Sequence, residues 1–168
     1  MILHTTPNVG YLPQPNHIDV VADRELAPVE LCATAFMIPL LPDGSVVMAQ
    51  NRRRGLEFPG GHIDPGESPC FAAVRECFEE TGYRVSHIRA IGYLEMVSEG
   101  TVPADWKYPH PVGYQQFFVG DVMGFEPYTE NDECLAPVIV SAAEAMRTFS
   151  PSRIAMLAQA HRVLRNRP

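Results

Sequence analysis

The alternation of hydrophobic and polar positions divides the chain into strands and three helices. Apolar runs at residues 31–40 and 45–50 flank a Pro-Asp-Gly turn, and this pattern predicts a hairpin of buried strands. Further strand patterns follow, at residues 85–97, 113–123 and 136–141. Helical periodicity falls at residues 69–81, at 142–149 and from about residue 151. Because strands and helices are mixed in this order, we expect an α/β or α+β sandwich.

Proline and glycine separate these elements and indicate the domain boundary. Residues 1–28 carry four prolines and weak periodicity, so we expect an extended N-terminal lead-in or edge segment. Residues 29–168 then form a single domain, since typical domains contain roughly 100 to 200 residues. Residues 51–67 are rich in glycine and charge and predict a loop, and residues 98–112 hold three prolines and predict a long loop.

The ends of the helices carry recognisable capping residues. Ser68 suits the N-cap of the helix at 69–81, Pro69 suits its first position, and Gly82 suits the residue just beyond its end. Ser141 is expected to cap the second helix. In the last helix the apolar stripe is predicted to comprise Ile154, Leu157, Ala158 and His161.

The helix at 69–81 has an acidic face. At about 100° per residue, Glu76, Glu79 and Glu80 project from one side, flanked by the small residues Ala72 and Ala73. The opposite side is apolar and is predicted to pack against the sheet with Phe71, Val74, Cys77, Phe78 and Thr81.

Clustered carboxylates repel one another, and Arg75 can neutralise only part of their charge. A divalent cation resolves the conflict, because Mg²⁺ prefers oxygen ligands and bridges to substrate phosphates. For E-x-x-E-E alone, a solvated acidic face would be the better explanation. The double glycine, the Pro-Gly turn and Glu67 at fixed offsets favour the metal-binding interpretation.

Composition narrows the choice of partners and compartment. The net charge of −7 disfavours long polyanions such as duplex nucleic acid, although a small phosphate compound can bind if a metal ion supplies positive charge. The four cysteines form no C-x-x-C pair and are interpreted as buried thiols in a reducing compartment. The chain shows neither a signal peptide pattern nor a membrane-length apolar run, so a cytoplasmic location is expected.

These residues resemble the signature of the Nudix hydrolases, the MutT-like family. Gly61, Glu67 and the run Arg-Glu-Cys-Phe-Glu-Glu-Thr-Gly-Tyr at 75–83 stand at the spacing of that signature. Cys77 and Tyr83 depart from it, because the family usually has aliphatic residues there. The resemblance implies an αβα sandwich with a mixed β-sheet, in which residues 61–83 form a loop-helix-loop.

The resemblance also implies roles for the motif residues. Magnesium, or alternatively manganese, would be bound by Gly61 through its carbonyl and by Glu67, Glu76, Glu79 and Glu80. Catalysis would depend on Glu79, Glu80 and Arg75, with Glu79 as the favoured general base and Arg75 orienting the glutamates. A distant-loop carboxylate is the alternative base, with candidates Glu130, Asp132 and Glu133.

Candidate substrate-binding residues lie outside the signature. Arg52 and Arg54, before the motif, suit phosphate, and Trp106 and Tyr108, in the long loop, suit a base. Glu57 is expected at the edge of the pocket, and Glu133 is included from the candidate bases. Ordinary surface charge and loop packing remain alternatives for each. On β-strand 113–123, either Gln115 and Phe117 or the alternate set with Gln116 faces the pocket.

The function implied is metal-dependent hydrolysis of a diphosphate bond in a nucleoside diphosphate linked to another moiety, such as a nucleoside triphosphate or a nucleotide sugar. Two alternatives stay open: a non-catalytic nucleotide-sensing domain of the same fold, and an isoprenoid-diphosphate isomerase. The partner is then a small nucleotide-like diphosphate rather than a membrane. A homodimer is a further expectation from the resemblance.

Overall fold

The structure is a computed structural model that describes residues 1–166. Its strands join one nine-stranded sheet with the order β1-β2-β7-β8-β3-β4-β5, while β6 pairs with β3 and β9 pairs with β4. The strands are β1 (Ile2–Pro7), β2 (Asn16–Ala22), β3 (Cys32–Leu40), β4 (Val46–Asn51), β5 (Gly55–Glu57), β6 (Gly60–His62), β7 (Tyr83–Ser98), β8 (Val112–Phe125) and β9 (Cys134–Val140). The helices are the 3₁₀ turn η1 (Val29–Leu31), α1 (Pro69–Thr81), α2 (Ala142–Thr148) and α3 (Pro151–Arg165).

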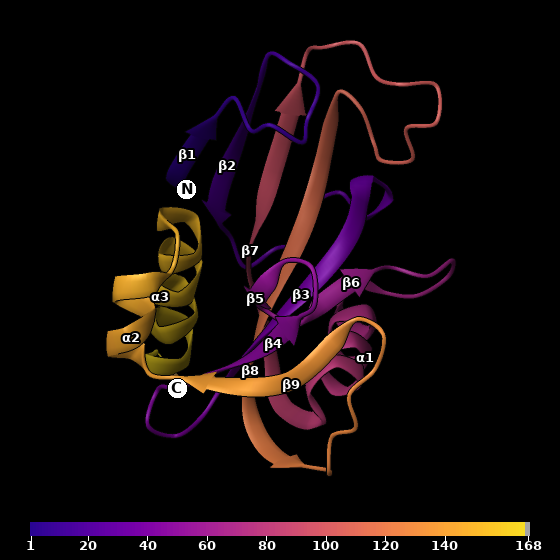
Figure 1. The fold of residues 1–168 in the computed structure, drawn as a ribbon. Helices are drawn as coiled ribbons and strands as arrows, with labels where there is room; N and C mark the ends of the chain where they lie inside the picture. The colour runs from indigo at the N-terminus through magenta and orange to yellow at the C-terminus, as the bar shows by residue number, and fades with distance from the viewer. Residues whose placement is uncertain (167–168) are drawn as a thin grey trace.

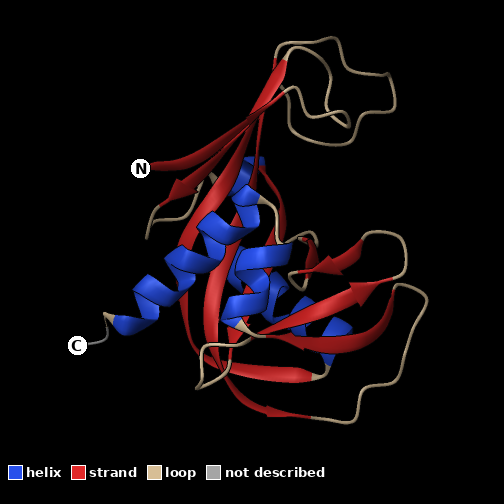
Figure 2. Ribbon diagram, turned by 60° about the vertical axis from the view of Figure 1, so that its left-hand side comes forward, coloured by secondary structure: helices blue, strands red, loops and turns tan. Residues whose placement is uncertain are grey.

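Helices cover both faces of the sheet (Figures 1 and 2). The alternating side chains of β3 divide the core in two, because successive residues of a strand point to opposite faces. Ile38 belongs to the cluster that contains Met156 of α3. Met37, its neighbour, belongs to the cluster that contains Ala73 of α1. β3 pairs in parallel with β8 and antiparallel with β4 and β6, so the predicted mixed sheet between helices is confirmed.

The predicted hairpin, the long loop before β8 and the three helices are present, but the segment at 51–67 is not one continuous loop. It contains β5 and β6, and β6 adds to the sheet beside β3. Glycine permits this pairing, because a Cβ at Gly60 would lie 2.5 Å from the carbonyl oxygen of Ala35. Two short strands within so polar a sequence follow from that close approach rather than from hydrophobic alternation.

Helix α1 begins and ends where predicted, but it is rotated about its axis relative to the prediction. Ser68 accepts a hydrogen bond from the Phe71 amide, and Gly82 adopts the left-handed conformation with φ 72°. Phe71, expected on the sheet-facing side, is 66% exposed. Cys77 and Thr81 are buried as predicted, and the residues buried in addition are Pro69, Ala72, Ala73 and Glu80. Small alanines let the helix lie close to β3, and this packing turns part of the acidic face inward.

The buried stripe of α3 also differs from the prediction. Ala158 is exposed and His161 is only partly buried. The fully buried apolar positions are Met156, Leu157, Ala160 and Val163. Met156 and Leu157 pack in the core cluster that contains Ile38 of β3, whereas His161 Nε2 lies 2.9 Å from the carbonyl oxygen of Gly44.

The first 28 residues contribute two strands. β2 pairs with β7, and β1 lies at the edge of the sheet beside β2. Within residues 1–166, no helix is both long enough and apolar enough to cross a membrane.

Candidate active site

The acidic helix α1 is attached to the end of β6 by one buried side chain. The Gly60 amide donates a hydrogen bond to Glu80 Oε2 at 2.8 Å, and Cys134 Sγ lies 3.4 Å from Glu80 Oε1. Glu80 is only 5% exposed. Its carboxylate therefore joins α1 to β6 on one side and to β9 on the other.

Arg75 is the centre of the charged cluster. Its guanidinium makes a two-pronged contact with Glu67, at 2.9 Å for both nitrogen–oxygen pairs. It also donates to Glu76 at 2.8 Å, to Glu79 at 3.2 Å and to the His62 carbonyl at 3.0 Å. Such a planar fork suits several carboxylates at once, whereas a lysine ammonium could not span them. Arg75 thus contacts three of the motif glutamates at once.

Burial and pairing shift the pKa values of the cluster in opposite directions. Burial raises the pKa values of the Glu76 and Glu80 carboxyls above 4.5. The hydrogen bond from Arg75 lowers the pKa of Glu67 below 4.5. For the two inner carboxylates, Glu76 and Glu80, the cost of burying the ionised form therefore exceeds the stabilisation that their partners provide.

Gly61 lies directly against one of these inner carboxylates. A Cβ at Gly61 would lie 2.5 Å from Glu76 Oε1 and 2.6 Å from Glu76 Cδ. Only a residue without a side chain allows the backbone of β6 to approach the glutamate this closely. The loop and the helix therefore form one continuous oxygen-rich surface.

This surface fits a hard divalent cation in the chemistry of its donors. The described residues contain no preassembled group of three or more His, Cys, Asp or Glu side chains that could hold a metal ion. Arg75 instead pairs with three of the glutamates. Two desolvated carboxylates, one of them packed against the backbone of Gly61, nevertheless match the preference of Mg²⁺ for oxygen ligands.

A cleft of about 930 Å³ opens beside the cluster and includes Gly61 and Glu76 in its wall. Five of the six predicted substrate-binding residues line it: Arg54, Glu57, Trp106, Tyr108 and Glu133. The aromatic residues form a connected wall, since the Trp106 and Tyr108 rings are 5.5 Å apart and the Tyr108 and His62 rings stack with centroids 6.0 Å apart.

Arg52, the sixth predicted residue, is not among those lining the cleft. Its guanidinium donates to Glu130 Oε2 and to the Asn131 carbonyl, both at 2.9 Å. Those contacts hold Arg52 against the β8–β9 loop, and they also occupy Glu130, one of the alternative bases. Of the three alternatives, only Glu133 lines the cleft.

Several cleft residues were not singled out from the sequence. Thr34, His62 and Arg153 line it, and Arg153 forms an ion pair with Glu57. Gln115 faces the cleft, whereas Gln116 is fully buried and joins the Ala27 amide to the Gly92 carbonyl. The pairing of β3 with β6 and β8 brings Thr34, His62 and Gln115 together, and Arg153 reaches the cleft from α3. Neither arrangement has a local sequence signal.

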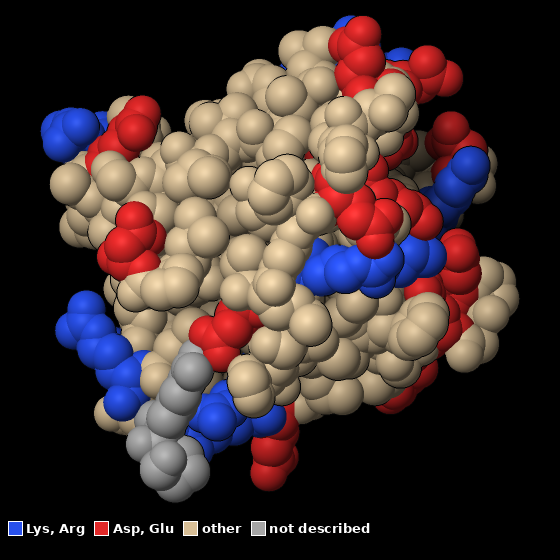
Figure 3. Space-filling view, turned by 90° about the horizontal axis from the view of Figure 1, so that it is seen from below, with Lys and Arg blue, Asp and Glu red and all other residues tan. Residues whose placement is uncertain are grey.

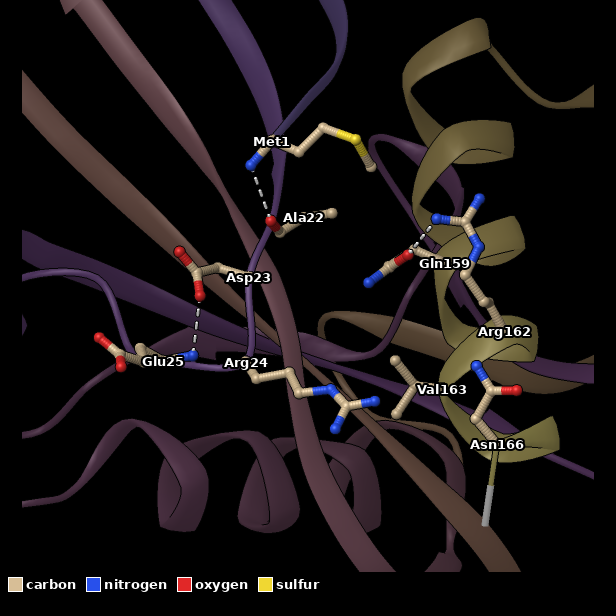
Figure 4. A pocket seen from close by; sticks show the side chains of 9 residues that line it. All are labelled: Met1, Ala22, Asp23, Arg24, Glu25, Gln159, Arg162, Val163 and Asn166. Carbon is tan, nitrogen blue, oxygen red and sulfur yellow. Dashed lines mark hydrogen bonds between the residues drawn. The ribbon is translucent and has the colours of Figure 1, made fainter.

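A second hollow of about 410 Å³ lies between the first strands and α3 (Figure 4). The Met1 ammonium donates to the Ala22 carbonyl there, and Arg162 donates to Gln159. It contains none of the motif residues. On the face shown in Figure 3, basic side chains are scattered and border acidic ones, which does not suit a long polyanion.

Comparison with known proteins identifies the family. The NUDIX domain model matches residues 31–162. Nudix hydrolase 3 of Caenorhabditis elegans is 32% identical over 116 residues, which cover 64% of this chain and 46% of that protein. The match therefore spans less than half of that relative.

Solved structures share the fold. A Bacillus subtilis pyrophosphohydrolase aligns with a TM-score of 0.60 and 22% identity, covering 77% of this chain and 75% of that one. A C. elegans Ap4A hydrolase aligns with a TM-score of 0.56 and 16% identity, covering 80% and 99%. Because the domain match includes the whole acidic cluster and most of the chain, this chain belongs to the NUDIX domain family.

Proposed function

We propose that the chain hydrolyses a diphosphate bond in a nucleoside diphosphate linked to another moiety, with Mg²⁺ or Mn²⁺ bound at the acidic cluster. The main support is the placement of Glu76 and Gly61 in the wall of a cleft large enough for a nucleotide. Two of the three solved or curated relatives named above are called hydrolases of phosphate compounds, which agrees with the proposal.

Most of the motif residues would bind the cation or position its ligands. Glu76, Glu80 and the Gly61 carbonyl would hold it, with Glu67 and Glu79 as further ligands. When bound, a divalent ion offsets the phosphate charge and makes a nucleophile available near neutral pH. Arg75 keeps the carboxylates in position through its contacts with Glu67, Glu76 and Glu79.

Glu79 is the proposed general base. Its side chain is 55% exposed, so water can reach it, and its hydrogen bond from Arg75 holds it at the edge of the cluster. Glu133 lines the cleft and is the alternative base. In the cleft, Arg54 is the arginine best placed to contact substrate phosphates.

The test is a panel of nucleoside triphosphates, nucleotide sugars and dinucleoside polyphosphates with Mg²⁺, with products identified by mass. Glu80→Gln should reduce the rate by about 10³-fold, because it removes one negative charge from the proposed cation site. The fold should persist, since the glutamine carbonyl can still accept the hydrogen bond from the Gly60 amide.

Glu144→Gln is the matched control, because Glu144 is exposed on α2, outside the cleft. It should leave the rate unchanged. Metal-dependent turnover that survives in Glu80→Gln would refute the metal assignment. No turnover of any substrate by the wild type would favour the nucleotide-sensing alternative.

A further inference from the structure

Two buried side-chain polar atoms in residues 1–166 lack a hydrogen-bond partner, and both belong to residues that line the cleft. They are Thr34 Oγ1 and Trp106 Nε1. Buried polar groups in folded proteins are almost always paired, because an unpaired one loses its hydrogen bonds to water without replacement. Because both residues line one cleft, a ligand bound there is the inferred hydrogen-bond partner of the two atoms.

The pairing of the strands places Thr34 beside other cleft residues. In the ladders of β3, Thr34 stands opposite His62 of β6 and opposite Gln115 of β8. Residues opposite each other in a sheet project from the same face. Thr34 is 9% exposed and lines the cleft between these two neighbours, with its hydroxyl oxygen buried.

Trp106 approaches the cleft from the loop between β7 and β8. Its amide donates to the Pro103 carbonyl, which forms a tight turn in that loop. Its ring contacts Tyr108 edge-on, and Tyr108 stacks on His62 with an angle of 20° between the planes. The aromatic chain thus connects Trp106 to the strand that flanks Thr34.

The remaining walls are suited to a flat ring. Phe36 and Phe117 stack with centroids 5.1 Å apart, and both line the cleft with Leu94 and Met96. A ligand that satisfies both orphan atoms needs an acceptor for the indole N–H, which only donates, and a donor or acceptor for the threonine hydroxyl. A planar heteroaromatic ring with polar edge atoms combines these properties.

Building on the hydrolysis proposed above, we propose that Thr34 and Trp106 read the nucleobase of the substrate by hydrogen bonds in this part of the cleft. The nucleoside part of the proposed substrate is thereby recognised through its base, and not only through its phosphates. Neither residue belongs to the acidic cluster, so the two residues determine specificity and binding rather than bond cleavage.

The test measures binding in the absence of metal, so it does not depend on hydrolysis. Trp106 is the single tryptophan of the chain, and its fluorescence reports directly on the proposed contact. The probes are AMP, GMP, CMP and UMP, with ribose 5-phosphate as the base-free comparison and N-acetyltryptophanamide to correct for absorbance. At least one nucleotide should bind about tenfold or more tightly than ribose 5-phosphate.

Variants separate hydrogen bonding from packing. Thr34→Val removes the hydroxyl at nearly constant volume and should weaken the preferred nucleotide by about three- to tenfold, whereas Thr34→Ser should restore its affinity. The matched control is Thr101→Val, which should leave affinity unchanged. Thr101 is an exposed threonine of the β7–β8 loop, the loop that also carries Trp106. Trp106→Phe, measured by calorimetry, should also weaken binding. Thermal melting confirms that each variant is folded, and Thr34→Val should melt no lower than the wild type.

The outcomes separate this inference from the proposed reaction. Base-dependent binding that falls in Thr34→Val and returns in Thr34→Ser supports the inference even if no diphosphate is hydrolysed. Equal affinity for the nucleotides and ribose 5-phosphate overturns it even if hydrolysis is observed. Unchanged nucleotide affinity in a folded Thr34→Val protein overturns it as well.

Discussion

The contact between Gly61 and Glu76 makes a single methyl group a sharp test of the acidic cluster. In Gly61→Ala the new Cβ would lie 2.5 Å from Glu76 Oε1, where ordinary contacts begin at 3.4 Å. The carboxylate must therefore retreat by roughly one ångström, and its 2.8 Å hydrogen bond with Arg75 must rearrange with it. The positive-φ region is not involved, so alanine adds no backbone strain of its own.

The magnitude follows from the sensitivity of catalysis to position. A displacement of about one ångström in a catalytic group costs about 10²-fold in rate. This corresponds to roughly 2.7 kcal/mol of transition-state stabilisation, at about 1.36 kcal/mol for each factor of ten. The effect should fall on kcat and on the concentration of Mg²⁺ needed for half-maximal rate, because Glu76 is a proposed ligand.

The assay is steady-state hydrolysis of the substrate chosen from the panel, over a range of Mg²⁺ concentrations. Gly124→Ala is the matched control, because a Cβ at Gly124 meets nothing within 4 Å, and it should keep wild-type activity. Thermal melting of both variants checks that the fold is retained. If folded Gly61→Ala retains kcat/KM within about threefold of the wild type, the present position of Glu76 is not required for catalysis.

Two further predictions concern protons. Burial raises the pKa of Glu80 above 4.5, so metal-free wild type should gain stability as pH falls from neutrality through that raised pKa. Its melting temperature in EDTA should then rise relative to Glu80→Gln between about pH 7.5 and 5, and a constant difference would contradict the burial argument. If Glu79 is the base, Glu79→Gln should lower kcat by about 10²-fold or more and Glu133→Gln by less than threefold. The reverse order in a pH–rate comparison would transfer the role to Glu133.

The parts of the structure that were predictable are those with local signals. The Ser68 cap, the Pro69 start and the Gly82 end depend on backbone geometry within one turn, and the structure shows all three. The fixed spacing of Gly61, Glu67 and the α1 glutamates likewise carried the family assignment, which the domain match confirms.

What escaped prediction depends on contacts between distant segments. Phe71 is apolar yet exposed, because the alanines beside it allow a closer approach to β3. Arg52 and Arg54 are near neighbours, and Arg52 is drawn away by partners 78 and 79 positions later in the chain. Thr34 lies in an apolar run, and only the register with His62 reveals that it lines the cleft.

Most hydrogen bonds and ion pairs of the acidic cluster join residues within one stretch of sequence, residues 60–80. Among residues 1–166, the polar partners of Arg75 are His62, Asp64, Glu67, Glu76 and Glu79. Glu80 accepts from the Gly60 amide, and Cys134 is its one distant hydrogen-bond partner there. The Trp106 loop, in contrast, enters the same cleft from a separate part of the chain. Insertions or exchanges in that loop can therefore alter which compounds are accepted while the charge arrangement stays intact. Such modularity offers a physical route by which one reactive unit diversifies over evolution.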